Sequence, residues 1–453
     1  MNKLTFLTTS VGLFDDDSLT SDAQDIQSAL SKFTQQSTMA VFDTRIFTFI
    51  QDLSAHLLKQ PEFRQFPELI ALGFWLRQAN LHKKIQKGIL KQWPSSDAER
   101  SNDNKMTDAK LDSFNHKVHS LSQLNRAIGC VVHFTPANVD TMFIYSWVAS
   151  LLMGNLNIVR VASQESQSKV ALLGLINHLF SQADHQEIAK RNVFVSYDKT
   201  SDMTPMLCAI ADARLMWGGD ASVAQIKSFS GKTNCRDFCF SDKYSIAIVS
   251  ANTLNADTSS VAQNLWRDTQ PFQQQACSSP RVLYVLYEKS DKINESLVAL
   301  FKQLNALAEQ AKDDWQAVGR TNEHLVLMQN IALMGDSVAN NAVLQLSRVS
   351  AINISKLSSS LLEMHDGNGL FFVRICQSLQ QIVAELSACL PEKLQTIAIN
   401  GVEQSRVEKK VTQLLPQAQF RVQALGQALD FDFKWDGYDL LSSLCQALDL
   451  PQA

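Results

Sequence analysis

Cys277 stands in the segment QPFQQQACSSPRVLYV, residues 270–285, between three glutamines and a stretch that alternates like a strand. A cysteine thiolate attacks carbonyl carbons readily and can carry an acyl group as a thioester, so this position is a candidate nucleophile. The alternative is a structural role, because free cysteine is among the residue types most often buried in protein cores. The spacing of this segment alone does not decide between the two.

Two other segments carry residue types suited to a ligand cleft. In HFTPANVDT, Asn138 follows a strand-like run, where a side-chain amide can point toward a ligand. In RLMWGGDASVAQIKSF, Gly218 and Gly219 precede a helical pattern for which Asp220 or Ser222 is the expected N-cap. A helix that starts behind glycines is a plausible diphosphate site. The same pattern is more often a plain tight turn, and the chain has no G-x-G-x-x-G motif.

The surrounding pattern predicts an α/β protein with two doubly wound, Rossmann-like domains. From residue 126 onward, short β-rich runs alternate with helical ones, and a second such series begins at KYSIAIVSA, residues 243–251. Sheets of this kind bind ligands at the carboxyl ends of their strands. The predicted divisions are an N-terminal helical layer of the cofactor domain (1–93), a polar arm for oligomerisation (94–124), a dinucleotide-binding domain (125–243), a catalytic domain (244–401) and a C-terminal helical segment (402–453).

The composition excludes several classes of protein. The chain has 453 residues, 45% of them hydrophobic, which suits globular domains rather than a disordered chain. Its formal net charge is −4 and its basic residues are dispersed, so we expect no nucleic-acid partner. No apolar run is long enough for a membrane span and no signal peptide is recognisable, which predicts a cytoplasmic protein. The eight scattered cysteines predict free thiols, and Cys235 with Cys239 lacks the second ligand pair of a zinc site.

The order of the motifs resembles the aldehyde dehydrogenase superfamily. The first motif is P-x-N after a strand, followed by a helix that ends in Gly-Asn and a strand that ends in a basic residue. A glycine pair that opens a helix comes next, and Q-x-C before a strand comes last. Within that superfamily, SWVASLLMGNLNIVRVAS, WGGD, SDKYSIAIV and QQQACSSPRV are similar to the acyl-CoA reductases, typified by the fatty acid reductase that supplies aldehyde to bacterial luciferase. The resemblance covers roughly residues 60–400 and implies an aldehyde dehydrogenase-like fold and a homo-oligomer.

The resemblance implies that Cys277 is the nucleophile and Asn138 a donor to the oxyanion. A fatty acyl thioester of coenzyme A, or of an acyl carrier, would then acylate Cys277 and be reduced to the aldehyde. Two hydrogen-bond donors aimed at the oxyanion, the Asn138 amide and the Cys277 backbone N–H, are each worth about 2.7–4 kcal/mol when preorganised.

One position departs from the hydrolytic aldehyde dehydrogenases. Those enzymes have a glutamate four residues before a lysine, and here the corresponding lysine is Lys243 while Cys239 occupies the glutamate position. Without that base, water is not activated against the acyl-enzyme, and a thiol becomes the natural exchange partner. A shift of this short alignment would instead place Asp237 or Asp242 there.

The resemblance also implies a nicotinamide dinucleotide at the strand ends. In relatives, the strand that ends in NIVRVAS here has a lysine at the position of Arg160, and an acidic residue at that of Ser163 favours a free 2′-hydroxyl. A cation with a hydroxyl suits a 2′-phosphate, so we expect NADPH rather than NADH. Arg160 is equally well explained as a solvated strand-end residue. The remaining cofactor-binding residues implied are Thr135, Pro136, Gly218, Gly219 and Asp220.

Several other residues are weaker candidates. Gln275 and His365 are weak candidates for lining the substrate cleft, the latter from the glycine-containing loop MHDGNGLFF. His133 is better explained as a core histidine with satisfied hydrogen bonds than as a base. The tryptophans are expected in cores rather than against a cofactor, as at Trp75, Trp147 and Trp217.

Two further functions stay open. One is an acyl-phosphate or semialdehyde reductase of the same fold, for which Arg267 and Arg281 are the cations nearest in sequence to Cys277. The other is an acyl-accepting subunit that works only in complex with an acyl-activating protein. Oxidation of NADPH by the purified protein with an acyl-CoA alone separates the second from a self-sufficient enzyme.

Overall fold

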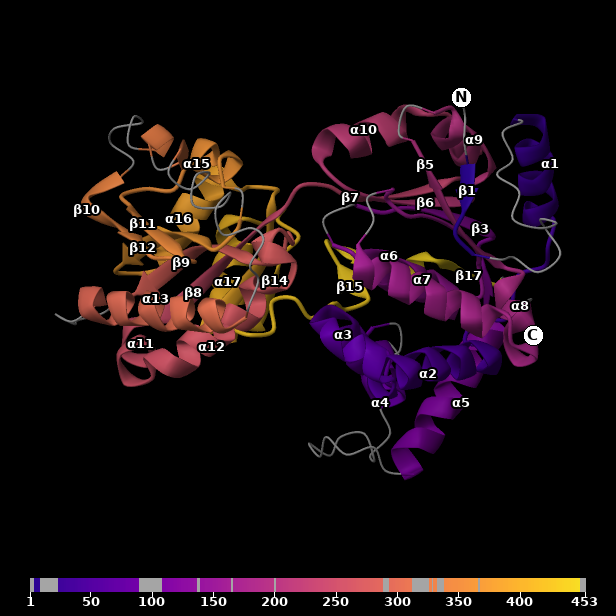
Figure 1. Cartoon of the computed structure of the whole chain (residues 1–453), viewed down its shortest axis with the longest axis horizontal. Helices are drawn as coiled ribbons and strands as arrows, with labels where there is room; N and C mark the ends of the chain where they lie inside the picture. The colour runs from indigo at the N-terminus through magenta and orange to yellow at the C-terminus, as the bar shows by residue number, and fades with distance from the viewer. Residues whose placement is uncertain are drawn as a thin grey trace. The chain divides into compact units, whose positions relative to one another are not determined.

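The chain forms two compact units, each with its own sheet (Figure 1). The computed structural model describes residues 4–8, 23–88, 108–136, 139–163, 166–198, 201–287, 293–311, 326–327, 329–331, 338–365 and 367–448. The first unit comprises Met1–Ser241 and Phe431–Ala453, and the second comprises Asp242–Asp430. In both units helices cover the two faces of a largely parallel sheet, which confirms the predicted doubly wound α/β class.

The sheet of the first unit has the order β1-β5-β4-β3-β6-β7. All its neighbours are parallel except β1 and β5. The central strands β3, β4 and β6 are buried along their whole length, as expected when helices cover both faces. From β3 the chain first adds β4 and β5 on one side and later β6 and β7 on the other, so the topological switch point lies between β3 and β6. The strands are β1 (Leu4–Phe6), β3 (Cys130–Phe134), β4 (Leu156–Arg160), β5 (Asn192–Tyr197), β6 (Ala213–Trp217) and β7 (Arg236–Phe240).

Two hydrophobic clusters cover the faces of this sheet. One face packs against α1 (Ala23–Thr34), α9 (Met203–Ile210) and α10 (Asp220–Ser228). The opposite face packs against a larger set that includes the N-terminal helices expected from the sequence. That set is α2 (Thr44–Lys59), α3 (Pro67–Trp75), α4 (Gln78–Lys87), α6 (Met142–Leu152), α7 (Gln167–Phe180) and α8 (Gln186–Ala189), with the 3-10 turns Pro61–Gln65 and Ala183–His185.

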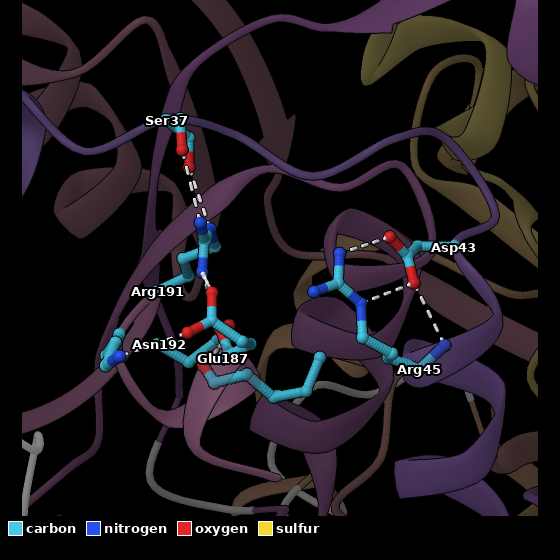
Figure 2. Close-up of polar contacts among 8 residues, drawn as sticks. Ser37, Asp43, Arg45, Glu187, Arg191 and Asn192 are labelled. Carbon is cyan, nitrogen blue, oxygen red and sulfur yellow. Dashed lines mark hydrogen bonds and ion pairs between the residues drawn. The ribbon is translucent and has the colours of Figure 1, made fainter. Parts of the chain in front are cut away.

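Polar contacts join the N-terminal helical segment to α8 (Figure 2). The guanidinium of Arg191 donates to the carbonyl oxygen of Ser37 and to the carboxylate of Glu187, each at 2.7 Å. Asp43 caps α2 by accepting from the backbone N–H of Arg45 at 2.9 Å, and also accepts from its guanidinium at 2.7 Å. The hydrogen bond from the Arg45 side chain lowers the pKa of the Asp43 carboxyl. These contacts fix the start of α2 against the α/β part of the unit.

A buried polar network fills the centre of the first unit. Nε2 of His133 lies 3.0 Å from the side-chain oxygen of Asn157, whose amide group donates to Asn192 at 2.9 Å. Nδ1 of His133 lies 2.8 Å from Oγ of Ser146, which accepts from the indole N–H of Trp217 at 3.0 Å. Burial lowers the pKa of His133 to about 4, so the ring is neutral, with Nε2 donating and Nδ1 accepting. His133 is a satisfied core histidine, as the sequence predicted.

The second unit has a seven-stranded sheet of order β10-β11-β12-β9-β8-β13-β14, antiparallel only between β10 and β11. Helices α11 (Ala251–Ala256), α12 (Thr258–Thr269) and α13 (Ile293–Gln310) cover one face. Helices α15 (Ser359–Glu363), α16 (Leu379–Cys389) and α17 (Gln404–Leu414) cover the other. The strands are β8 (Tyr244–Ser250), β9 (Pro280–Leu286), β10 (Val338–Gln345), β11 (Ser350–Ile354), β12 (Leu370–Cys376), β13 (Leu394–Asn400) and β14 (Arg421–Ala424).

The C-terminal segment 402–453 differs from the helical segment predicted for it. Beyond α17 it contributes β14 to the second unit, then β15 (Lys434–Trp435), β16 (Tyr438–Asp439), α18 (Leu440–Ser443) and β17 (Cys445–Ala447) to the first. Strand β17 pairs with β2 (Asn125–Ala127), and the indole N–H of Trp75 donates to the carbonyl of Phe431 at 2.9 Å. Strand pairing and aromatic packing thus outweigh helical propensity here.

Only part of the predicted arm at 94–124 lies among the described residues. Residues 108–124 form α5 (Asp108–Leu124), and Phe114 on this helix stacks on His82 of α4 with ring centroids 3.9 Å apart. Burial lowers the pKa of His82 to about 4, which keeps the stacked imidazole neutral. Among the described residues, no helix is both long and apolar enough to cross a lipid bilayer.

Candidate active site

The candidate nucleophile lies in a turn at the amino end of β9, between the 3-10 turn Pro271–Gln274 and the strand. Cys277 is partly exposed, and its carbonyl oxygen accepts a hydrogen bond from Oγ of Ser245 at 2.7 Å. The same hydroxyl oxygen accepts from the backbone N–H of Thr396 at 3.1 Å. Because Ser245 is on β8 and Thr396 on β13, the carbonyl of the nucleophile is tied to two neighbouring strands. The turn is therefore held by the centre of the sheet.

Burial affects the thiols of the seven other cysteines of the chain. Burial raises the pKa of each of these thiols, to about 12 for Cys130 and Cys376 and to about 11 for Cys445. A raised pKa leaves little thiolate at neutral pH, so these thiols are poor nucleophiles. The others with a raised pKa are Cys208, Cys235, Cys239 and Cys389.

Gln275 and His365, the two residues predicted to line the substrate cleft, occupy different environments. Gln275 is partly exposed, and its backbone N–H donates to the carbonyl of Phe272 at 2.8 Å. His365 is buried within the second unit, with Nε2 3.0 Å from the carbonyl of Leu370 and Nδ1 accepting from the N–H of Gly367 at 3.2 Å. Both ring nitrogens therefore hold the loop that precedes β12, and the expectation that His365 lines a cleft is corrected. Its ring packs on the core instead.

A pocket in the second unit borders this turn. Its floor is apolar and comes from α12, α13 and two strand starts: Trp266, Leu304, Ala308, Val349 and Phe371. Its rim is polar and includes Gln273, four residues before Cys277, together with Thr269, Gln270, Arg348, Asn368 and Gly369. An apolar floor with a polar rim suits a ligand that has a hydrocarbon part and a polar end.

In the first unit, the predicted cofactor residues come together at the carboxyl ends of three adjacent strands. Thr135 and Pro136 follow β3, Arg160 ends β4, and Gly218 with Gly219 follows β6. The backbone N–H and the hydroxyl of Thr135 both donate to the carbonyl of Arg160, at 3.3 and 2.7 Å. The glycine pair and Thr135 flank the switch point between β3 and β6, where doubly wound sheets bind ligands. Ser163 lies exposed three residues beyond β4.

The start of α10 differs from the expected capping. Its N-cap is Gly219, which has no side chain to cap the helix, and Asp220 is the first helical residue and is exposed. The expectation that Asp220 or Ser222 supplies the cap is therefore corrected. The first backbone N–H groups of a helix have no partner within the helix, and the diphosphate interpretation of this turn stays a prediction.

Arg160 is buried rather than solvated, with 8% of its surface exposed. Its guanidinium lies 5.5 Å from the ring centroid of Tyr197 and donates to the carbonyl of Thr135 at 3.4 Å. Burial lowers the pKa of Arg160, with Tyr197 and Asp198 acting in the opposite direction. Among the described residues, no carboxylate lies within ion-pair distance of this guanidinium, so a cation is held at the end of β4 largely by a ring and a carbonyl group.

Lys169 is a second buried cation at this place, and the sequence did not point to it. It lies in the first turn of α7, with 7% of its side chain exposed, and its ammonium is 3.4 Å from Asp140 and 3.5 Å from the carbonyl of Ala162. Ala162 lies between Arg160 and Ser163 in sequence. A positive side chain is unfavourable in the first turn of a helix, so the fold concentrates positive charge here against the helix dipole.

Two further predictions concern the oxyanion donor and the position of the missing glutamate. The predicted donor, Asn138, lies outside the described residues. Cys239 is on β7, and Asp237, the acid that a register shift would bring to its place, is held by Nε and Nη2 of Arg214 at 2.7 Å each. Both carboxylate oxygens of Asp237 are therefore engaged by one guanidinium. The Lys243 ammonium donates to the carbonyl of Glu392 at 2.5 Å.

Solved structures of aldehyde dehydrogenases share this fold. The chain is similar to a lactaldehyde dehydrogenase, with a TM-score of 0.57 and 12% identity over 93% of this chain and 88% of that one. It is also similar to an NAD-dependent aldehyde dehydrogenase from Sinorhizobium meliloti, with a TM-score of 0.58 and 11% identity over 94% of this chain and 86% of that one. A P. syringae indole-3-acetaldehyde dehydrogenase solved with NAD+ has a TM-score of 0.55 and 12% identity, over 93% and 86% of the two chains. The fold is therefore that of the aldehyde dehydrogenases.

The family follows from the sequence itself. Residues 20–447 match the family described as Acyl-CoA reductase (LuxC), and the chain belongs to that family. It is thus an oxidoreductase of the acyl-CoA reductase class, which confirms the resemblance seen in the motifs. No curated protein matches the sequence significantly.

Proposed function

We propose that the protein reduces fatty acyl-CoA thioesters to aldehydes with NADPH, through an acyl-enzyme on Cys277. The observation that carries this proposal is the position of Cys277, partly exposed in a turn fixed at the amino end of β9, in a chain of the acyl-CoA reductase family. Cys277 is one of four partly exposed cysteines, and burial raises the pKa of the other three thiols, those of Cys235, Cys239 and Cys389.

In the first step the Cys277 thiolate attacks the carbonyl carbon of the thioester. The bond from Sγ to that carbon forms and the bond to the coenzyme A sulfur breaks. Coenzyme A leaves as a thiolate and takes up the proton that was released when Cys277 ionised. The dinucleotide, when bound, supplies the hydride that reduces the acyl carbonyl. Release of the aldehyde then regenerates the Cys277 thiolate. Asn138 and the backbone N–H of Cys277 are the proposed donors to the oxyanion in both steps.

The cofactor site supports NADPH over NADH. Arg160 and Lys169 bring two positive charges to residues 160–163, and Asp140 offsets one of them at 3.4 Å. The hydroxyl of Ser163 stands where relatives have an acidic residue. A 2′-phosphate would add a charge that these cations can pair with, whereas a 2′-hydroxyl would not.

The acyl tail has a proposed place in the pocket between α12 and α13. Its rim residue Gln273 lies four residues before Cys277, and its floor is built from apolar side chains. Burying a methylene group contributes about 0.8 kcal/mol, so a floor of this kind favours longer acyl chains.

The acyl-phosphate alternative finds less support. Arg281, its proposed phosphate ligand, donates to the carbonyl of His365 at 3.0 Å and lies 5.1 Å from the ring centroid of Tyr244. Arg267 is exposed on α12 and donates to Asn264 at 3.3 Å. The Arg281 guanidinium, on β9 itself, therefore has Nη1 engaged within the fold. The acyl-accepting subunit remains the second candidate, because an accessible thiol serves it equally well.

One assay tests the proposal and separates it from the alternatives. Purified protein with acyl-CoA and NADPH should yield aldehyde and free coenzyme A in equal amounts. If NADPH is oxidised only after an acyl-activating protein is added, the acyl-accepting subunit is correct. NAD-dependent conversion of aldehyde to carboxylate without any thiol would contradict the proposal.

A further inference from the structure

The three residues that lead into the nucleophile turn have left-handed backbones. The φ angles of Phe272, Gln273 and Gln274 are 57°, 54° and 62°, and none of the three is glycine. A single non-glycine residue in this region is uncommon, and a run of three is strained because each Cβ lies close to the following carbonyl group. Such strain persists only where surrounding contacts determine the conformation, and it clusters at functional sites.

The side chain of Gln274 supplies those contacts. It is fully buried, and its amide group donates to the carbonyl of Pro280 at 2.8 Å and to the carbonyl of Leu370 at 2.9 Å. Its side-chain oxygen accepts from the backbone N–H of Gly369 at 3.1 Å. One amide therefore joins the nucleophile turn to the first residues of β9 and β12 and uses both donors and the acceptor in doing so.

The backbone of the loop before β12 contacts the backbone of the strained run, residues 272–274. The N–H of Asn368 donates to the carbonyl of Gln273 at 2.8 Å. Gly367 has a φ of 84°, and a Cβ at this position would lie 2.8 Å from that same carbonyl oxygen. Gly369 has a φ of 82°, and its Cβ would lie 2.7 Å from the carbonyl of Arg348. Both glycines are required by space and by conformation, and Gly367 is the one that lets this loop contact the strained run.

We propose that Gln274 is a positioning residue for the nucleophile: its amide holds the left-handed run in place and thereby sets the location of the Cys277 thiol and backbone N–H. The inference rests on the proposed role of Cys277. Residues 275 and 276 alone separate the clamped residue from the nucleophile, and the carbonyl of Cys277 is fixed from the other side by Ser245. Release of the Gln274 amide lets the run relax toward right-handed backbone angles, which displaces the residues that follow.

The test uses Gln274→Glu, because the pH controls whether the introduced carboxyl group is protonated and can donate a hydrogen bond. At low pH the protonated carboxyl has one O–H to donate to one of the two carbonyl groups. At high pH the carboxylate has no donor and faces two carbonyl oxygens, so it opens the clamp. The rate of Cys277 acylation in one turnover with acyl-CoA is followed by intact mass from pH 5 to pH 9. Its ratio to the wild-type rate should fall with rising pH to about 10⁻², because a displacement near 1 Å can cost about that factor.

Two comparisons make the result decisive. Gln380→Glu makes the same chemical change at an exposed position on α16 and should follow the wild-type profile at every pH. Circular dichroism at each pH shows whether the Gln274→Glu protein remains folded, and Gln274→Met provides a clamp that is open at all pH values. A folded Gln274→Glu protein whose acylation parallels the wild type overturns the inference. Failure of the wild-type protein to acylate Cys277 would instead overturn the proposed function.

Discussion

The guanidinium carbon of Arg160 lies 5.5 Å from the ring centroid of Tyr197, at the ends of two neighbouring parallel strands. Burial raises the pKa of the Tyr197 hydroxyl to about 12, so the ring is neutral at working pH and faces a cation. The hydroxyl itself lies 3.1 Å from Oγ1 of Thr204. The neutral ring contacts Arg160 without pairing with its charge, and the charge of Asp198 favours the ionised guanidinium.

Arg160→Ala should weaken binding of the 2′-phosphate and leave the rest of the dinucleotide site intact. Loss of a charge-assisted contact of about 1.5–3 kcal/mol corresponds to about a 10- to 150-fold weaker affinity. Calorimetry with adenosine 2′,5′-bisphosphate and with adenosine 5′-monophosphate separates the two contributions without any turnover. Tyr197→Phe keeps the ring and should preserve the ratio of the two affinities. An equal preference for both nucleotides in the wild-type protein would contradict the assignment of NADPH.

Cys277→Ala should abolish covalent labelling by acyl-CoA. Incubation of the wild-type protein without reductant should add one acyl mass, which peptide mapping should locate at Cys277. Cys239→Ala is the matched control, because burial raises the pKa of that thiol and its removal should leave labelling unchanged. Labelling that survives in Cys277→Ala would show that another thiol is the nucleophile.

Ala308→Phe should shorten the acyl chains that the enzyme accepts. The larger side chain fills the apolar floor of the pocket between α12 and α13, and each methylene that loses its place costs about 0.8 kcal/mol, or about fourfold in affinity. The matched control is Val298→Phe, at an exposed position of the same helix. The measurement compares acylation by acyl-CoAs of increasing length. An unchanged length profile in Ala308→Phe places the tail elsewhere.

The sequence predicted the parts of the site that depend on local pattern, and it missed those that depend on tertiary contacts. Cys277 before a strand and Arg160 at a strand end follow from periodicity and motif order, and both occupy such positions. Nothing in the sequence distinguishes Gln274 from the neighbouring glutamines, because its role depends on the carbonyl group of Leu370, 96 residues away. Lys169 resembles any helical lysine until its burial beside Asp140 is known.

In the C-terminal segment, too, the sequence predicted the local helix and missed the strands that depend on distant residues. Its helical pattern between 404 and 414 is real, and α17 occupies it. Farther on, β17 forms only because β2, more than three hundred residues earlier, offers an edge to pair with. The cap of α10 was also mispredicted, because Gly219 takes the capping backbone conformation that a side-chain rule assigned to Asp220.

The last prediction concerns Asp268, whose carboxylate accepts from the backbone N–H groups of Gly426 and Ala428 at 2.6 and 2.8 Å. Burial raises its pKa to about 7, although the hydrogen bonds from these two N–H groups act to lower the pKa. Between about pH 4 and pH 7 the folded protein therefore holds a proton that the unfolded chain has released. The contribution of this group to stability must then fall as the pH rises through that window, and stay constant above it.

Asp268→Asn removes the titrating group and with it this slope. The amide cannot accept both backbone N–H bonds, so the variant should be less stable than the wild type at every pH. The deficit should nevertheless shrink between pH 5 and pH 7.5, because only the wild type loses stability over that range. Urea unfolding midpoints of the second unit, followed at several pH values, measure the difference, and Glu295→Gln at an exposed acid of α13 serves as the control. A deficit that is constant or grows with pH would show that Asp268 is ionised in the folded protein throughout, held so by the two N–H groups.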